Sequence, residues 1–203
     1  MGIARNIARL VPNGSGLLPN ANIEAVAASK LTGQVPDANA PSGSVIQVVS
    51  VTKTDTASGT NLMSSDSYGT VLTASITPIS SSSKILVMYN VNCGGNLASG
   101  DAAVVSRLVR NGSTPLAIGD ASSVRKRTTT GHGWPAGRSD FYAQHNMSFW
   151  DSPATTSSTT YSVQLACRGT GGNTWYLNRS DADGDNIESS RAASTITVME
   201  IAA

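Results

Sequence analysis

Charged residues are scarce in this sequence of 203 residues. They make up 13% of the chain, and the formal net charge is only +1. An average globular protein contains about 25% charged residues, and coiled coils and charged disordered chains contain more. Both of those classes are therefore excluded. A chain this close to neutrality also lacks the general electrostatic field that gathers nucleic acid or anionic membranes, so we expect no nucleic acid among its partners.

Long apolar runs are absent as well. No stretch approaches the roughly 18 apolar residues that a membrane-spanning helix requires. The opening sequence MGIARNIARLVPNGSGLLPN contains two arginines but no continuous apolar segment, which argues against a secretory signal. Asn6 stands where a myristoylation motif needs Ser or Thr. We therefore expect no membrane insertion.

Cysteine is rare, and its two residues lie far apart. A secreted disulfide-rich domain would contain more cysteines than Cys93 and Cys167, and a zinc site would need further ligands near them. We expect both to be buried free thiols, with a disulfide between them as the alternative. The sequence indicates no cofactor.

From Gly43 onward, short runs rich in β-branched residues alternate with turn-forming residues. Asn111-Gly112 is a strong hairpin signal, because both residues accept a positive φ angle. Eight short strands without a long helix predict an all-β fold, a jelly-roll-like β-sandwich over residues 43–203. The predicted strands are Val45–Val51, Gly69–Ile76, Lys84–Asn92, Ala102–Arg110, Ala143–Trp150, Thr160–Arg168, Thr174–Asn178 and Ser194–Ile201.

Residues 1–42 have a different pattern, in which prolines and glycines interrupt small apolar groups. Only short helices fit, at Ile3–Leu10 and at Ile23–Lys30, the second with Asn22 as its N-cap. The segment cannot build a core, yet it carries more apolar residues than a solvated linker. We predict an extended N-terminal arm that becomes ordered against another molecule. The residues expected to anchor it are Ile3, Ile7, Leu10, Val11, Leu17 and Leu18.

Three predicted strands carry apolar side chains on both faces. A single sandwich needs one apolar face per strand and leaves the other face in water. Either the chain's own loops or another subunit must cover the second face, and we expect another subunit in a closed cyclic assembly. The opposed sets are Leu86 and Met88 against Ile85, Val104 and Leu108 against Val105 and Val109, and Met199 and Ile201 against Ile196 and Val198.

Catalytic motifs are missing from the sequence. Gly119–Ala121 is similar to the start of a lipase-type Gly-Asp-Ser block but lacks the serine, and no Gly-x-Ser-x-Gly elbow occurs. His132 and His145 are the only histidines, and no spacing places either beside a serine and a carboxylate. We assign no catalytic residue and expect a protein that is not an enzyme.

Two segments are candidate binding sites. Asp181, Asp183 and Asp185 alternate around Gly184 as in a calcium loop, but the position that needs a bidentate Glu is Ala192. A carboxylate-rich turn is the simpler interpretation, so this is a weak metal candidate. The second segment is a long polar loop over residues 122–139, a candidate for contact with an anionic sugar or a lipopolysaccharide phosphate. The alternatives are a solvated loop without a binding role, or a loop that packs against a neighbouring subunit. Its candidate contact residues are Arg125, Lys126, Arg127, His132, Trp134 and Arg138.

A series of short motifs, in this order, resembles a β-domain found in bacteriophage virion proteins, especially tail fibres and related appendages. The resemblance covers most of residues 43–203, and Leu31–Pro36 (LTGQVP) is similar to the segments that precede such domains. The motifs are Gly43–Val49 (GSVIQVV), Thr52–Thr56 (TKTDT), Ile76–Pro78 (ITP), Ser81–Val87 (SSSKILV), Arg110–Ser113 (RNGS), Leu116–Asp120 (LAIGD), Leu177–Ser180 (LNRS) and Ala193–Ile201 (ASTITVMEI).

The resemblance implies a non-enzymatic virion component, assembled in the host bacterial cytoplasm as a homotrimer of jelly-roll-like domains. Its implied partners are its own copies, other tail or capsid proteins that hold the arm, and a host surface glycan. No long shaft separates arm and domain, unlike in the commoner fibres, so a capsid decoration protein is the alternative. A carbohydrate-active enzyme is the least favoured class, because paired carboxylates or a triad are missing.

Overall fold

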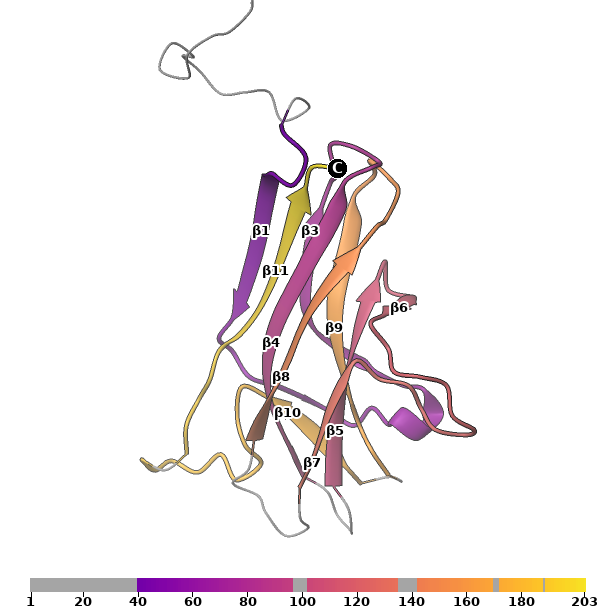
Figure 1. Cartoon of the computed structure of the whole chain (residues 1–203). Coiled ribbons are helices and arrows are strands. Elements are labelled where there is room, and N and C mark those ends of the chain that lie inside the picture. Colours follow the sequence, from indigo (N-terminus) through magenta and orange to yellow (C-terminus); the bar gives the residue numbers. More distant parts are fainter. Residues whose placement is uncertain (1–39, 97–101, 135–141, 170–171, 188) are drawn as a thin grey trace, which may run out of the picture. The chain divides into compact units, whose positions relative to one another are not determined.

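Two antiparallel β-sheets face each other in this protein (Figure 1). The computed structural model describes residues 40–96, 102–134, 142–169, 172–187 and 189–203. Apart from a single 3-10 turn at Met63–Ser65, the regular elements of these residues are strands. The strands are β1 (Val45–Lys53), β2 (Ala57–Gly59), β3 (Gly69–Ile76), β4 (Lys84–Asn96), β5 (Ala102–Arg110), β6 (Thr114–Leu116), β7 (Thr130–Trp134), β8 (Tyr142–Asp151), β9 (Thr159–Cys167), β10 (Thr174–Leu177) and β11 (Ser194–Ile201).

The strand order is that of a jelly roll. The larger sheet has the order β1-β11-β4-β8, and β10 and β2 continue it along the second half of β4. The smaller sheet has the order β3-β9-β5, and β6 and β7 pair with successive parts of β5. Successive long strands thus alternate between two four-stranded sheets, 1-11-4-8 and 3-9-5-7. The predicted all-β, jelly-roll-like sandwich is confirmed.

All eight predicted strands are present, with small shifts at their ends. The Asn111-Gly112 hairpin is also confirmed, with φ angles of 49° and 75°. Three short strands, β2, β6 and β7, were missed. The expectation of one long loop over residues 122–139 is wrong, because Thr130–Trp134 forms β7. Its glycines, Gly131 and Gly133, have low β-propensity, but pairing with β5 outweighs that preference.

Several sequence-based predictions lie outside the residues that the structure describes. They are the two short helices, Arg138, and the arm residues Ile3, Ile7, Leu10, Val11, Leu17 and Leu18.

The core lies between the two sheets. On β4 the inward side chains are Ile85, Val87, Tyr89 and Val91, and all four are buried. Cys93 and Cys167 enter the same core from opposite sheets as free thiols, as predicted. Burial raises the pKa of each thiol to about 12, so neither is a reactive thiolate at neutral pH.

Some strands carry apolar side chains on both faces, and the expectation that another subunit covers their second face is wrong for β5. Val104 and Leu108 lie in the core, while Val105 and Val109 on the opposite face are only 8% and 1% exposed within the single chain. Ile201 on β11 is likewise buried, at 9% exposure. The expectation therefore remains only for the outer face of the larger sheet.

A buried polar cluster joins the two sheets at one end of the sandwich. Asp151 on β8 accepts hydrogen bonds from Arg110 on β5, at 2.7 and 2.8 Å, and from the hydroxyl of Tyr161 on β9, at 2.7 Å. Asp151 is 7% exposed and Tyr161 is fully buried. A carboxylate in such a place needs both partners, because its unpaired charge is costly out of water.

His145 is the other polar side chain of note in the interior. It lies on β8, is 2% exposed, and neither ring nitrogen has a hydrogen-bond partner among the described residues. Burial, and to a lesser extent the neighbouring His132, lower its pKa to about 4. The folded chain therefore holds this imidazole neutral.

Within the described residues, no helix combines the length and the apolar character needed to cross a membrane.

We predict that Arg110→Met lowers the free energy of unfolding by about 3 kcal/mol, because it leaves the Asp151 carboxylate buried without its cation. Urea denaturation measures the change. Arg125→Met is the matched control, since Arg125 is exposed, and should change stability by less than about 0.5 kcal/mol. Equal effects of the two substitutions would contradict the assigned role.

We also predict a stability loss in mild acid that depends on His145. An unfolded histidine titrates near pH 6.5, so between pH 6.5 and 4 the unfolded chain binds more protons than the folded chain. The contribution of His145 is complete above pH 6.5 and falls by about 3 kcal/mol as the pH drops to 4 and below. Urea unfolding at pH 7, 5 and 4 should show that His145→Leu removes this part of the pH dependence. If the free energy of unfolding depends on pH in His145→Leu as it does in the wild-type chain, the prediction is refuted.

Candidate interaction surface

The outer face of the larger sheet carries a continuous row of large apolar side chains. The register of the four strands places Val48 on β1 opposite Met199 on β11, Met199 opposite Leu86 on β4, and Leu86 opposite Trp150 on β8. We call these four residues the apolar row. Residues directly opposite each other in antiparallel strands have neighbouring side chains on the same face. The row therefore crosses the whole sheet.

Much of the apolar row is in contact with solvent. Val48 is 52% and Trp150 is 54% exposed, while Leu86 and Met199 are half-buried. Val45, next to the row on β1, is 56% exposed. Single exposed apolar residues are common on monomers, but an aligned group on one face is typical of an interaction site.

Two further rows follow the apolar row along the same face, and their side chains are polar apart from Met88. One consists of Ser50, Thr197, Met88 and Ser148, and the other of Thr52, Thr195, Asn90 and Asn146. None of the residues in the three rows carries a charge. The face can therefore meet an uncharged surface, or a copy of itself, without electrostatic repulsion.

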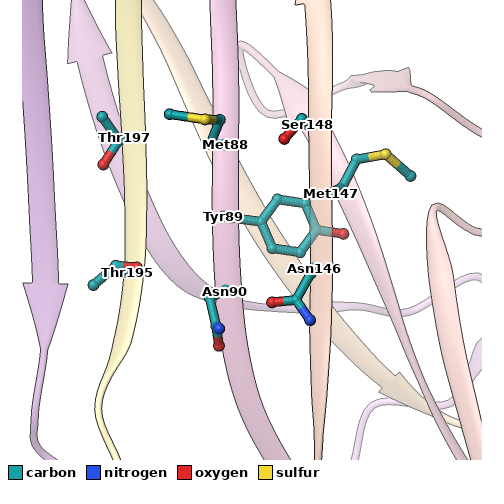
Figure 2. A pocket seen from close by; sticks show the side chains of 8 residues that line it. All are labelled: Met88, Tyr89, Asn90, Asn146, Met147, Ser148, Thr195 and Thr197. Atoms are coloured by element: carbon teal, nitrogen blue, oxygen red, sulfur yellow. The ribbon is translucent and has the colours of Figure 1, made fainter.

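A shallow hollow of about 600 Å³ lies over these polar rows. Figure 2 shows Met88 and Asn90 on β4 between the threonines of β11 and the side chains of β8. The ring of Tyr89 is buried, and its hydroxyl lies 3.1 Å from that of Ser106 in the other sheet. The lining offers amides, hydroxyls and two thioethers but no acid or base near neutral pH. Its chemistry suits contact and hydrogen bonding rather than proton transfer.

A second hollow, of about 530 Å³, lies beside Trp150 where the domain begins and ends. Ser42, Gly43, Lys84 and the last residues of the chain complete its lining. The backbone N–H of Gly43 donates to the carbonyl of Ala202 at 2.8 Å. Ser42 and Gly43 therefore lie next to one end of the apolar row.

The residues of the predicted glycan-contact loop are not all in one loop. Arg125 and Lys126 are exposed, and Arg127 donates from its guanidinium to the carbonyl of Gly119. His132 instead lies half-buried on β7, opposite Val104 of β5. Trp134 ends the same strand. Of the candidates that the structure describes, only Arg125, Lys126 and Arg127 therefore share a loop.

The predicted carboxylate-rich turn has arginine partners. Asp183 lies 2.8 Å from the guanidinium of Arg191 and 3.5 Å from that of Arg179, which also stacks on the Tyr176 ring at 4.0 Å. In the part of the chain that the structure describes, no group of three or more His, Cys, Asp or Glu residues could hold a metal ion. These arginines give Asp183 a structural role in the turn.

Sequence reasoning recognised Leu86, Met88 and Met199 as outward apolar residues but missed Val48 and Trp150. The missing information was the register between strands. Alternation along one strand tells which residues share a face, while the alignment of neighbouring strands decides which of them form a row.

Comparison with known proteins identifies no family for this chain. No family model and no curated protein matches it. Among solved structures, the Gx strain of infectious bursal disease virus matches with a TM-score of 0.39 and 11% identity, over 77% of this chain and 37% of that chain. The VP2 subviral particle of the same virus matches with a TM-score of 0.35 and 11% identity, over 89% of this chain and 42% of that chain. This chain thus spans about two fifths of the length of those structures, and identities and scores this low are not evidence of a shared function.

Proposed function

We propose that this chain is a non-enzymatic structural protein of a bacteriophage particle, in which three copies form a tail-fibre or knob-type appendage. The observation that carries the proposal is the outer face of the larger sheet, where the apolar row is exposed and none of the three rows carries a charge. The order of sequence motifs that resembles phage appendage domains supports it. In this proposal the arm of residues 1–42 attaches the trimer to other virion proteins.

Association of copies would stabilise the exposed side chains of the apolar row. Removing half-exposed residues such as Val48 and Trp150 from water contributes on the order of 1 kcal/mol each. A closed cyclic trimer repeats the same contact in every copy, so the gain is multiplied and no interface is left open. The β5 face needs no such cover, which restricts the contact to the larger sheet.

The non-enzymatic role rests on the chemistry of the residues present. His145 is buried with a pKa of about 4, so it is out of reach as a general base for a dissolved substrate. The thiols of Cys93 and Cys167 are buried and protonated at neutral pH. The proposal therefore assigns binding and assembly, and no reaction.

The position of residues 40–43 gives the domain a direction. Residues 40–43 enter at one end of the sandwich, whereas the segment 178–193 lies near the other end, where Ser194 pairs with Lys53 (Figure 1). In an anchored particle this second end would point away from the attachment point. Arg125 and Lys126 are exposed cations, and we assign them to contact with an anionic host glycan.

Capsid decoration is the second candidate. It is favoured by the short distance in sequence between arm and domain, since β1 begins at Val45, three residues after the arm of residues 1–42. The two locations are separated by cryo-electron microscopy of intact particles. Density for this domain on the tail supports the appendage, and density on the head supports decoration.

We expect the purified chain to have about three times its monomer mass of 20.8 kDa in solution, because trimer formation covers the apolar row. Size-exclusion chromatography with light scattering gives the mass. A clean monomer at micromolar concentration would rule out the self-association on which the proposal depends.

Deleting residues 1–42 should leave a folded β-domain that no longer joins particles, because the core of the sandwich lies entirely after this segment. Circular dichroism reports the fold, and sedimentation with assembling particles reports attachment. Incorporation of the truncated chain at the normal level would show that the arm is not the anchor.

A further inference from the structure

We propose that a second copy of this chain covers the open edge of strand β8, together with the Trp150 end of the apolar row. The proposal rests on the self-association in the proposed function and names the surface through which the copies meet.

The other edges of the described sheets carry features that discourage pairing with another chain. The β1 edge has a bulge between Val45 and Gln47 and ends in Lys53, and the sheet continues on that side with the three-residue strand β2. The β3 edge has a bulge between Thr70 and Leu72. On the opposite side of the smaller sheet, β6 is three residues long and contains Pro115, and β7 is only five residues long. Bulges, prolines, lysines and short strands are the usual protection of sheet edges.

Strand β8 has none of these features. It is ten residues long, pairs with β4 from Tyr142 to Asp151 without a register shift, and contains no proline, lysine or arginine. On its other side, no backbone hydrogen bond to the described residues is present. A long, regular and unpaired edge is a template for pairing with another strand. A partner there would satisfy a row of backbone N–H and C=O groups.

The side chains next to this edge favour a copy of the same chain as the partner. Trp150, at the end of the apolar row, is 54% exposed, and Gln144, Asn146 and Ser148 on the same face of β8 are uncharged. A surface that meets its own copy cannot tolerate a concentration of like charges, and this one has none. An anionic or cationic partner would find no complementary charge on the three rows. Edge and face together thus match a contact between identical copies.

The test introduces a lysine at the proposed contact and an identical one away from it. Ser148→Lys places a charge on the exposed face of β8, next to the open edge. Ser75→Lys is the matched control, because Ser75 is an exposed serine on the edge strand β3 of the other sheet. Light scattering at a series of concentrations gives the mass, and circular dichroism with thermal melting confirms that each variant is folded.

We expect the wild-type chain and Ser75→Lys to remain oligomeric, and Ser148→Lys to be a folded monomer. Uncompensated like charges should raise the dissociation constant for self-association of Ser148→Lys about 100-fold or more. Hydrogen exchange provides a second readout. The β8 amides that face away from β4 should be protected in the wild-type oligomer and exchange quickly in the variant.

The outcomes separate this inference from the proposed function. If Ser148→Lys keeps the wild-type mass, copies meet elsewhere, and the β8 contact is overturned while self-association stands. If the wild-type chain itself is monomeric, both are overturned. Should Ser148→Lys fail to fold, Trp150→Gln replaces it, since the Trp150 side chain is half exposed. An unchanged mass of Trp150→Gln would again overturn the β8 contact. Rapid hydrogen exchange of the β8 edge amides in a wild-type oligomer would also overturn the β8 contact.

Discussion

The register of strand β4 is the constraint on which the rest of this structure depends. Its thirteen residues pair with β11 and β10 on one side and with β8 on the other. Because side chains alternate along a strand, this register directs Ile85 and Val87 into the core and Leu86 and Met88 outward. A slip by one residue would exchange the two sets and expose the core. The apolar row and the interior are thus two consequences of one alignment.

Polar groups stabilise this alignment at places where an apolar core alone would allow the sheets to shift. Asp151 binds a cation and a hydroxyl that both come from the opposite sheet. On β11, the buried carboxylate of Glu200 accepts hydrogen bonds from the side chain of Gln47 and from the backbone of Ile79. Burial by itself would raise the pKa of Glu200, but these hydrogen bonds and another from the backbone N–H of Ser80 lower it. Groups of this kind require a defined geometry, so they favour a single register.

The proposed assembly follows from what the single chain leaves uncovered. One sheet is covered by the chain's own segments to the extent that Val105 and Val109 are buried. The other sheet keeps Val48 and Trp150 exposed, and no backbone hydrogen bond from the described residues reaches the outer edge of β8. Trp150 lies on β8 itself, so a second copy would cover this end of the apolar row and the edge at once. This coincidence is a stronger argument for an interface than either feature alone.

Local pattern was sufficient to predict the strands, because alternation and turn residues such as Asn111-Gly112 act over a few neighbouring residues. It also predicted two buried thiols and the sandwich class. Local pattern did not predict β7, whose glycines form a strand only because β5 provides a partner, and it placed His132 in a loop. Likewise, the row from Val48 to Trp150 and the open edge of β8 depend on which strands are neighbours and how they align. The pairs of the row lie 64 to 151 residues apart in the chain, so the tertiary structure alone decided them.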